Sequence, residues 1–151
     1  MCAGAQGAAG LVILRLRPHR KPKVTIRVVR LGGARADGKG TRIGTVRRPP
    51  RGVRKEVFAC QNWYDVWFPN LAPSIATMKF AQQATTTQEW LAFNKKYRAE
   101  MATPENSRTL DLLAALSHHS NFSVGCYCAD ESRCHRAVLC ALLAERGAKL
   151  E

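Results

Sequence analysis

Hydrophobic and polar positions along the chain follow two periods, one typical of strands and one typical of helices. Val24 to Leu31 is rich in β-branched residues, which predicts a strand, and Thr41 to Val46 predicts a second. The segment from Arg47 to Gly52 ends that strand, because its two prolines cannot continue a hydrogen-bonded ladder. Phe122 to Cys128 predicts a third, buried strand.

The helical period appears four times, each time next to a helix start or stop signal. Ser74 predicts a helix cap and a helix to about Ala84, and Thr86-Thr87-Gln88-Glu89 fits a capping box before a helix to about Met101. Thr103-Pro104 opens a helix to about His119. In this helix we expect three leucines to face inward: Leu110, Leu113 and either Leu112 or Leu116. A last helix is predicted from Arg133 to Arg146, before Gly147.

This order of elements predicts one small α/β domain with a short mixed sheet covered by helices, in a three-layer α/β/α-like arrangement. The domain is expected over residues 24–151, and residues 1–23 are expected to form a mobile basic tail. A chain of 151 residues, 46% of them apolar, is large enough to bury one core.

Positive charge is concentrated in the first third of the chain. Residues 1–55 hold 15 Lys/Arg and one acid, whereas residues 56–151 hold 9 Lys/Arg and 10 acids. Such a block is typical of proteins that bind nucleic acid, anionic lipid or a phosphorylated ligand, although a solvated basic tail has the same composition. No apolar run reaches the roughly 18 residues of a membrane span, and the first residues make a poor secretory signal because they lack a cationic n-region. We therefore expect a cytoplasmic protein with reduced thiols and no membrane partner.

The turn between the last strand and the last helix carries the strongest candidates for chemistry. With Ser132 as the N-cap, Cys134 would lie near N2 and His135 near N3 of the helix. A helix start favours a thiolate and a neutral histidine, so Cys134 is a candidate nucleophile and His135 a candidate acid or base. Arg133 and Arg136 beside the same helix start favour an anionic ligand. The alternative is that Cys134 is only a small buried residue.

The same turn raises the question of a zinc site or a redox-sensing site. Cys126 and Cys128 share one strand face but are not expected to form a disulfide with each other. Cys134 and His135, if both helical, would diverge by about 100°, which argues against one tetrahedral site. A zinc ion bound by Cys126, Cys128 and Cys134 would need a further ligand such as Cys60. Our primary expectation is therefore that the protein has no cofactor.

Several spaced motifs together resemble the bacterial and archaeal family called domain of unknown function 488, which includes the YeaO-like proteins. The matching stretches are Thr45–Val53, Tyr64–Ser74, Trp90-x-x-Phe93 with Tyr97-Arg98-x-Glu100, Cys126-Tyr127-Cys128 and Cys134-His135-Arg136. The resemblance implies a compact α/β domain and a cytoplasmic protein, and it brings no established reaction. Some branches of the family carry an Asn-His-Ala-like triplet at the last motif. The resemblance therefore favours His135 over Cys134 as the residue with a role common to the family.

These observations lead to one main hypothesis about function and two alternatives. The main hypothesis is a pocket that binds a phosphate-bearing small molecule or nucleic acid. Hydrolase or transferase chemistry on this ligand is a further expectation. Whether the protein is an enzyme stays open. The expected pocket residues are Arg48, Arg51, Tyr64, Asp65, Arg133, Cys134, His135 and Arg136. One alternative is a non-enzymatic module that binds nucleic acid or a partner through the basic first third, and the other is a structural zinc or redox-sensing role for the cysteines.

Overall fold

The structure is a computed structural model that describes residues 24–35, 38 and 40–151. The expected tail, residues 1–23, lies outside the described residues. The strands are β1 (Ile26–Arg30), β2 (Thr41–Gly44), β3 (Val66–Trp67) and β4 (Phe122–Cys126). The helices are α1 (Ile75–Gln83), α2 (Thr87–Met101), α3 (Pro104–Leu116) and α4 (His135–Glu145), with short 3-10 turns η1 (Lys55–Val57) and η2 (Pro69–Leu71).

The four strands form one sheet in the order β1-β4-β2-β3. β4 pairs with β1 through Ile26 opposite Phe122 and with β2 through Thr41 opposite Phe122, and β2 pairs with β3. The expected α/β class and single small domain are confirmed. The sheet differs from the expected mixed one, since every pairing among the described strands is parallel. Parallel pairing places the carboxyl ends of the strands at one edge, where sites form in such folds.

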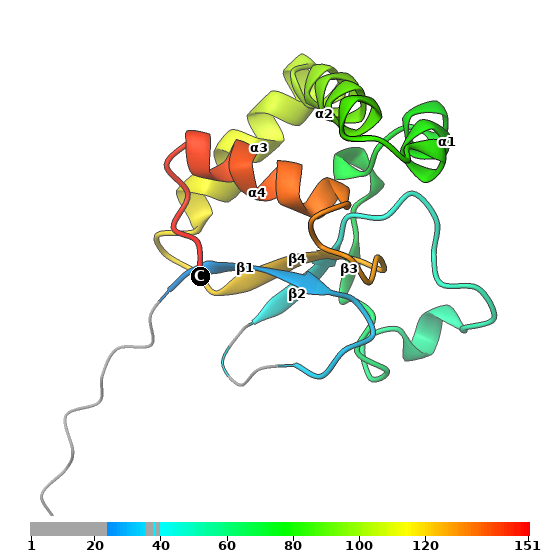
Figure 1. Ribbon diagram of the computed structural model, residues 1–151. Coiled ribbons are helices and arrows are strands. Elements are labelled where there is room, and N and C mark those ends of the chain that lie inside the picture. The colour runs from blue at the N-terminus through cyan, green and yellow to red at the C-terminus, as the bar shows by residue number, and fades with distance from the viewer. Residues whose placement is uncertain (1–23, 36–37, 39) are drawn as a thin grey trace, which may run out of the picture.

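All four helices lie on the same face of the sheet (Figure 1). Their apolar side chains form the main core with the strand residues Ile26, Phe122 and Val124. These strand side chains face the helices, and the side chains next to them in sequence face the other side of the sheet, because strand side chains have a period of two. α2 contributes Phe93, Tyr97 and Met101, α3 contributes Leu110 and Leu113, and α4 contributes Val138, Leu139, Leu142 and Leu143. These three helices therefore depend on the sheet for most of their apolar burial.

The second face of the sheet carries an irregular segment where a three-layer fold would have helices. Phe58 and Tyr64 pack there at 5.0 Å between ring centroids, in a second core cluster with Leu31 and Val46. Tyr64 fits because Gly44 has no side chain: a Cβ at that position would lie 2.4 Å from Tyr64 Cδ1. The buried guanidinium of Arg42 donates to the backbone oxygens of Gly33, Ala34 and Asn62, which holds the irregular segment against the strands.

The starts of α1 and α2 follow the predicted capping signals. Ser74 Oγ accepts from Thr77 N at 3.2 Å, and Thr86 with Glu89 forms the complete capping box. α3 is shorter than expected, and both alternatives for its third inward leucine were wrong, since Leu112 and Leu116 are exposed. None of the described helices combines the length and the apolar character that a membrane crossing requires.

Candidate functional site

The candidate site lies where the carboxyl ends of β2 and β4 meet the start of α4. β4 ends at Cys126, and the chain turns through residues 127–133 before α4 begins at His135. Gly125 O accepts from both the N–H and the hydroxyl of Thr45, which ties the end of β2 to the end of β4. The arrangement brings two strand ends and one helix start to the same place.

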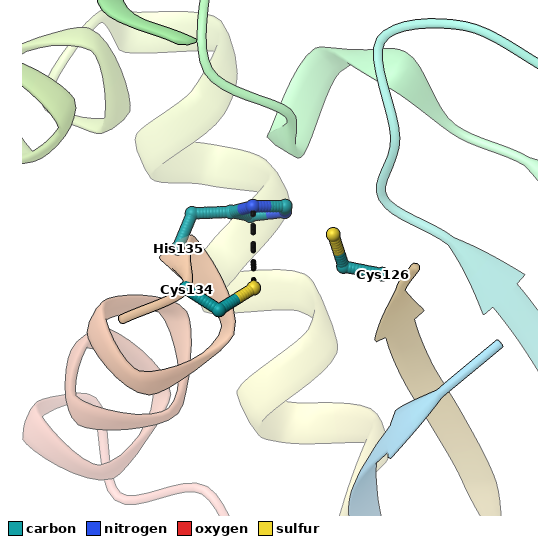
Figure 2. Close-up of side chains that lie close together, drawn as sticks. All are labelled: Cys126, Cys134 and His135. Carbon is teal, nitrogen blue, oxygen red and sulfur yellow. Dashed lines mark hydrogen bonds between the residues drawn. The ribbon is translucent and has the colours of Figure 1, made fainter. Parts of the chain in front are cut away.

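Cys134 is the N-cap of α4, which corrects the predicted position near N2. Its backbone is extended, with φ −134° and ψ 147°, and its Sγ accepts from the backbone N–H of Arg136 at 3.5 Å. His135 is accordingly the first helical residue rather than the third. Because Cys134 is not helical, its side chain does not diverge from that of His135 as neighbours on a helix would. Both side chains point toward Cys126 at the end of β4 (Figure 2).

The imidazole of His135 is held in one orientation inside the protein. Its Nε2 lies 2.8 Å from Thr45 O, and since a carbonyl oxygen can only accept, Nε2 carries the proton. This leaves Nδ1 facing the Cys134 Sγ at 3.8 Å (Figure 2). The ring of Tyr97 packs edge-on against the imidazole at 5.6 Å between centroids. His135 therefore presents a single nitrogen, Nδ1, to the thiol cluster.

Three thiols share this small volume. Cys126 Sγ and Cys128 Sγ are 3.5 Å apart, too far for a disulfide but within hydrogen-bonding distance. The pKa of Cys134 is lowered well below its ordinary value, because hydrogen bonds from the Cys126 and Cys128 thiols outweigh the effect of burial. The pKa of Cys126 is raised far above its ordinary value by its hydrogen bonds to the other two cysteines and by burial. Of these thiols, Cys134 therefore carries a negative charge more readily than Cys126.

Arg136 lies beneath the cluster and is only 3% exposed. Its guanidinium donates to Cys128 O at 2.9 Å, and within the described part of the chain its buried Nε has no hydrogen-bond partner. A buried guanidinium is costly unless negative charge lies nearby. The thiol cluster can carry such charge. The hydrogen bond with Cys126 and the positive charge of Arg136 lower the pKa of Cys128, but the hydrogen bond with Cys134, burial and the charge of Cys134 outweigh them and raise it.

Above the cluster opens a cavity of about 880 Å³. Its polar lining is cationic, since five arginines and no carboxylate line it among the described residues. Its apolar lining includes Trp63, Met78, Trp90 and Phe93. The five arginines are Arg30, Arg47, Arg48, Arg51 and Arg133.

The cavity brings together most of the residues that the sequence indicated. Arg48, Arg51 and Arg133 line it with Cys134 and His135. Arg136 does not line it but lies below Cys128. Ligand binding by these residues stays a prediction.

The structure places Tyr64 and Asp65 away from the cavity lining. Tyr64 is buried on Gly44 on the second face of the sheet. Asp65 forms a two-pronged ion pair with Arg35, at 2.7 and 2.8 Å, and accepts from Arg42 N. The pKa of Asp65 is lowered, mainly by the hydrogen bonds from Arg35. These contacts tie the β1–β2 connection to the segment before β3.

Sequence reasoning did not include Arg30, Arg47, Trp63 or Trp90 in the site. Arg30 is the last residue of β1, so its place at the carboxyl end of a parallel strand was a usable signal. Arg47 donates to Pro73 O at 3.0 Å and to Ala72 O at 2.7 Å, contacts between segments that no local pattern connects. Trp90 reaches the cavity from α2 and stacks on Phe93 at 4.6 Å.

Three residues of the cluster have the donor atoms and spacing for a metal ion. The ligand atoms of Cys126, Cys134 and His135 all lie within 4.8 Å of one another, and all three residues are buried. The geometric objection to Cys134 and His135 sharing a site was wrong, because it assumed that both residues are helical. Cys60, the expected further ligand, is exposed and donates to Val57 O.

The fold and site define a class: a parallel α/β domain with a cysteine–histidine cluster beneath an arginine-lined cavity. The comparison with family models then gives the family. The chain belongs to the DUF488 family, because the model DUF488-N3a, described as the active DUF488-N3 subclade, matches residues 26–147. No curated protein and no solved structure matches the chain. The resemblance stated from the sequence motifs is thus confirmed.

Proposed function

We propose that this protein binds a phosphate-bearing ligand, a nucleotide or a nucleotide unit of a nucleic acid, in the arginine-lined cavity. The observation that carries the proposal is the set of five arginines around one cavity with no carboxylate among its described lining residues. Arginine forks match the geometry of phosphate oxygens and bind them through charge-assisted hydrogen bonds. Such a lining favours an anion over a neutral or cationic ligand.

The position of these arginines supports a preformed site. Arg47 is held by two backbone carbonyls, Pro73 O and Ala72 O, so its side chain is oriented before any ligand arrives. Arg48 and Arg51 follow in the next four residues, and both side chains are exposed. An oriented arginine beside two exposed ones gives an anion a defined location and further charged contacts.

The apolar lining supports a nucleotide rather than a bare anion. Trp63 and Trp90 are half-buried in the cavity wall and offer aromatic faces to a base. Base–aromatic stacking contributes about 1–3 kcal/mol per base. A ligand that combines one phosphate with one base would use both parts of the lining.

Chemistry on this ligand would take place at the floor of the cavity. Cys134 and His135 line the floor, Cys134 as candidate nucleophile and His135 Nδ1 as candidate acid or base. The matching family model is described as an active subclade, and a hydrolase or transferase reaction is the chemistry that we propose here. Binding by the arginines does not depend on which reaction follows.

The test compares two arginine variants by calorimetric titration with a nucleoside monophosphate. Arg51→Ala removes a cavity arginine and is expected to weaken binding about tenfold or more, as the loss of a charge-assisted hydrogen bond predicts. Arg108→Ala removes an exposed arginine of α3 outside the cavity lining and is expected to leave binding unchanged. Equal weakening by both variants, or no binding by the unaltered protein, would overturn the proposal.

A further inference from the structure

We propose that the cluster at the cavity floor binds one zinc ion through Cys126, Cys128, Cys134 and His135. This inference goes beyond ligand binding by the arginines and assigns Cys134 as a metal ligand rather than a nucleophile. Zinc is the divalent ion that three thiolates and one imidazole select, because these soft and borderline donors suit it and tetrahedral coordination satisfies it.

Three of the four proposed ligand atoms, those of Cys126, Cys134 and His135, already lie within 4.8 Å of one another. With Zn–S near 2.3 Å and Zn–N near 2.0–2.1 Å, tetrahedral angles imply about 3.8 Å between two sulfurs and about 3.6 Å between sulfur and nitrogen. The Cys126 and Cys128 sulfurs are 3.5 Å apart, and Cys134 Sγ is 3.8 Å from His135 Nδ1. Cys128 lies outside the group of three mutually close ligand atoms, and as the exposed residue just after β4 it would complete the site by moving closer to Cys134 and His135.

The groups around the donors are those that support a bound metal. A histidine ligand commonly donates its other ring N–H to a backbone carbonyl, and His135 Nε2 does so to Thr45 O at 2.8 Å. This contact leaves Nδ1 as the ring nitrogen that is directed at the cluster. The backbone N–H of Arg136 donates to Cys134 Sγ, which stabilises a thiolate there.

The charge of the proposed site also accounts for the buried arginine. Three thiolates and one Zn²⁺ carry a net charge of −1, which one guanidinium neutralises. Arg136 is that guanidinium, since it is buried and donates to the backbone carbonyl of Cys128, one of the proposed ligands. Without negative charge in the cluster, its burial would be uncompensated.

Two other cysteines provide matched controls. Cys60 is exposed on the irregular segment, and Cys140 lies in the middle of α4 outside the cluster. Replacing either by serine changes the number of thiols and leaves the proposed ligands intact. Cys128 is the exposed member of the proposed set, so Cys128→Ser tests a ligand whose replacement does not disturb the core.

The experiment measures metal content and coordination in the full chain, purified without added chelator. Elemental analysis is expected to find about one zinc per chain in the unaltered protein and in Cys60→Ser and Cys140→Ser. Cys134→Ser is expected to hold less than a tenth of that amount. Cys128→Ser is expected to retain a site with at least tenfold weaker affinity in competition with a chromogenic chelator.

Cobalt substitution gives a second measurement that does not depend on how the variants fold. In the unaltered protein, Co²⁺ is expected to give the intense visible bands of tetrahedral coordination together with a thiolate-to-cobalt charge-transfer band. Cys128→Ser is expected to lose about a third of the charge-transfer intensity, as the loss of one of three thiolates predicts. An unaltered protein without stoichiometric zinc and without the tetrahedral cobalt spectrum would overturn the proposal. The proposal of nucleotide binding does not depend on this result, because the titration of the unaltered protein and Arg51→Ala with a nucleoside monophosphate tests it independently.

Discussion

At Gly125, the second-last residue of β4, the absence of a side chain lets two neighbours approach the strand. A Cβ there would lie 2.7 Å from Leu31 Cδ2 and 2.7 Å from Val29 O. Both distances are far below ordinary contact, and the second involves backbone that cannot rotate away. Leu31 also lines the cavity, and Cys126 is the next residue, so Gly125 sets how closely the sheet approaches the site.

Gly125→Ala is expected to lower the free energy of unfolding by about 1–3 kcal/mol, the usual cost of overpacking. Urea denaturation followed by circular dichroism measures this change. Gly33→Ala is the matched control, because its added Cβ would meet only Arg30 O at an ordinary 3.5 Å. The control is expected to stay within about 0.5 kcal/mol of the unaltered protein. A Gly125→Ala protein as stable as the control would show that β4 adjusts freely.

The residues of the site show what sequence reasoning could and could not supply. Motif spacing placed Cys134, His135 and Arg51 among the candidates, and the structure places all three around one cavity. The convergence of Cys126, Cys134 and His135 was not predictable, because it depends on a helix boundary two residues later than the capping signal at Ser132 indicated. Local hydrogen-bonding propensity favours serine as a cap, whereas the fold places Cys134 there.

Among the elements, α1 and α2 are joined by one carboxylate. Glu100 near the end of α2 accepts from Ser74 N at 2.9 Å and from Thr77 Oγ1 at 2.6 Å, both at the start of α1. Burial by itself would raise the pKa of Glu100, but these hydrogen bonds and the charge of Arg47 outweigh it, so the pKa is lowered. This carboxylate therefore stabilises the fold in its ionised form.

The sign of the pH dependence follows from that lowered pKa. The stabilisation is fully present above the unfolded pKa of about 4.3 and is lost as the pH falls through the lower pKa of the folded state. Glu100→Gln is expected to cost about 1–3 kcal/mol at pH 7, and this difference from the unaltered protein is expected to shrink below about pH 4. Denaturant unfolding over a series of pH values measures both effects. Glu56→Gln, in the exposed turn η1, is the control and should change neither the stability at pH 7 nor its pH dependence. A loss of stability in Glu100→Gln that is independent of pH would contradict the stabilising role of the ionised Glu100 carboxylate.

The elements that could be predicted are those with strong local signals. The capping residues Ser74 and Thr86 located the starts of α1 and α2 because their side chains bond the first free N–H groups. β3 escaped prediction because it has only two residues, Val66 and Trp67, too few to show a period. Its pairing with β2 depends on contacts distant in sequence, which no local pattern contains.

At the scale of the whole molecule, the order of the strands decides where the site forms. β4 comes last in the sequence but lies between β1 and β2. This insertion brings Cys126 between the ends of two strands that carry arginines, Arg30 on β1 and Arg47 after β2. The sequence predicted an α/β domain from its elements, but the parallel direction and the central place of β4 arise from long-range packing of buried apolar strands.

The cavity lining and residues 1–23 hold five Lys/Arg residues each, and the two groups predict different binding behaviour. Residues 1–23 include five basic residues, Arg15, Arg17, Arg20, Lys21 and Lys23. If the cavity binds the ligand, deletion of residues 1–23 should leave the affinity for a nucleoside monophosphate within about twofold. The same deletion should lower the salt dependence of binding to a single-stranded oligonucleotide, because each lost phosphate contact reduces the slope of log affinity against log salt by about 0.7.

Titrations of the full chain and the deletion variant with both ligands, at several salt concentrations, measure the two effects side by side. Arg51→Ala should have the opposite effects. Its affinity for the monophosphate should fall about tenfold or more, and the slope of log affinity for the oligonucleotide against log salt should fall by no more than the value of one phosphate contact. A mononucleotide offers a single phosphate group, whereas an oligonucleotide offers many, so comparing the two ligands separates binding at one phosphate site from contacts spread along a strand. Loss of monophosphate binding on deletion, with Arg51→Ala unaffected, would assign binding to the basic first third and leave the cavity without its proposed ligand.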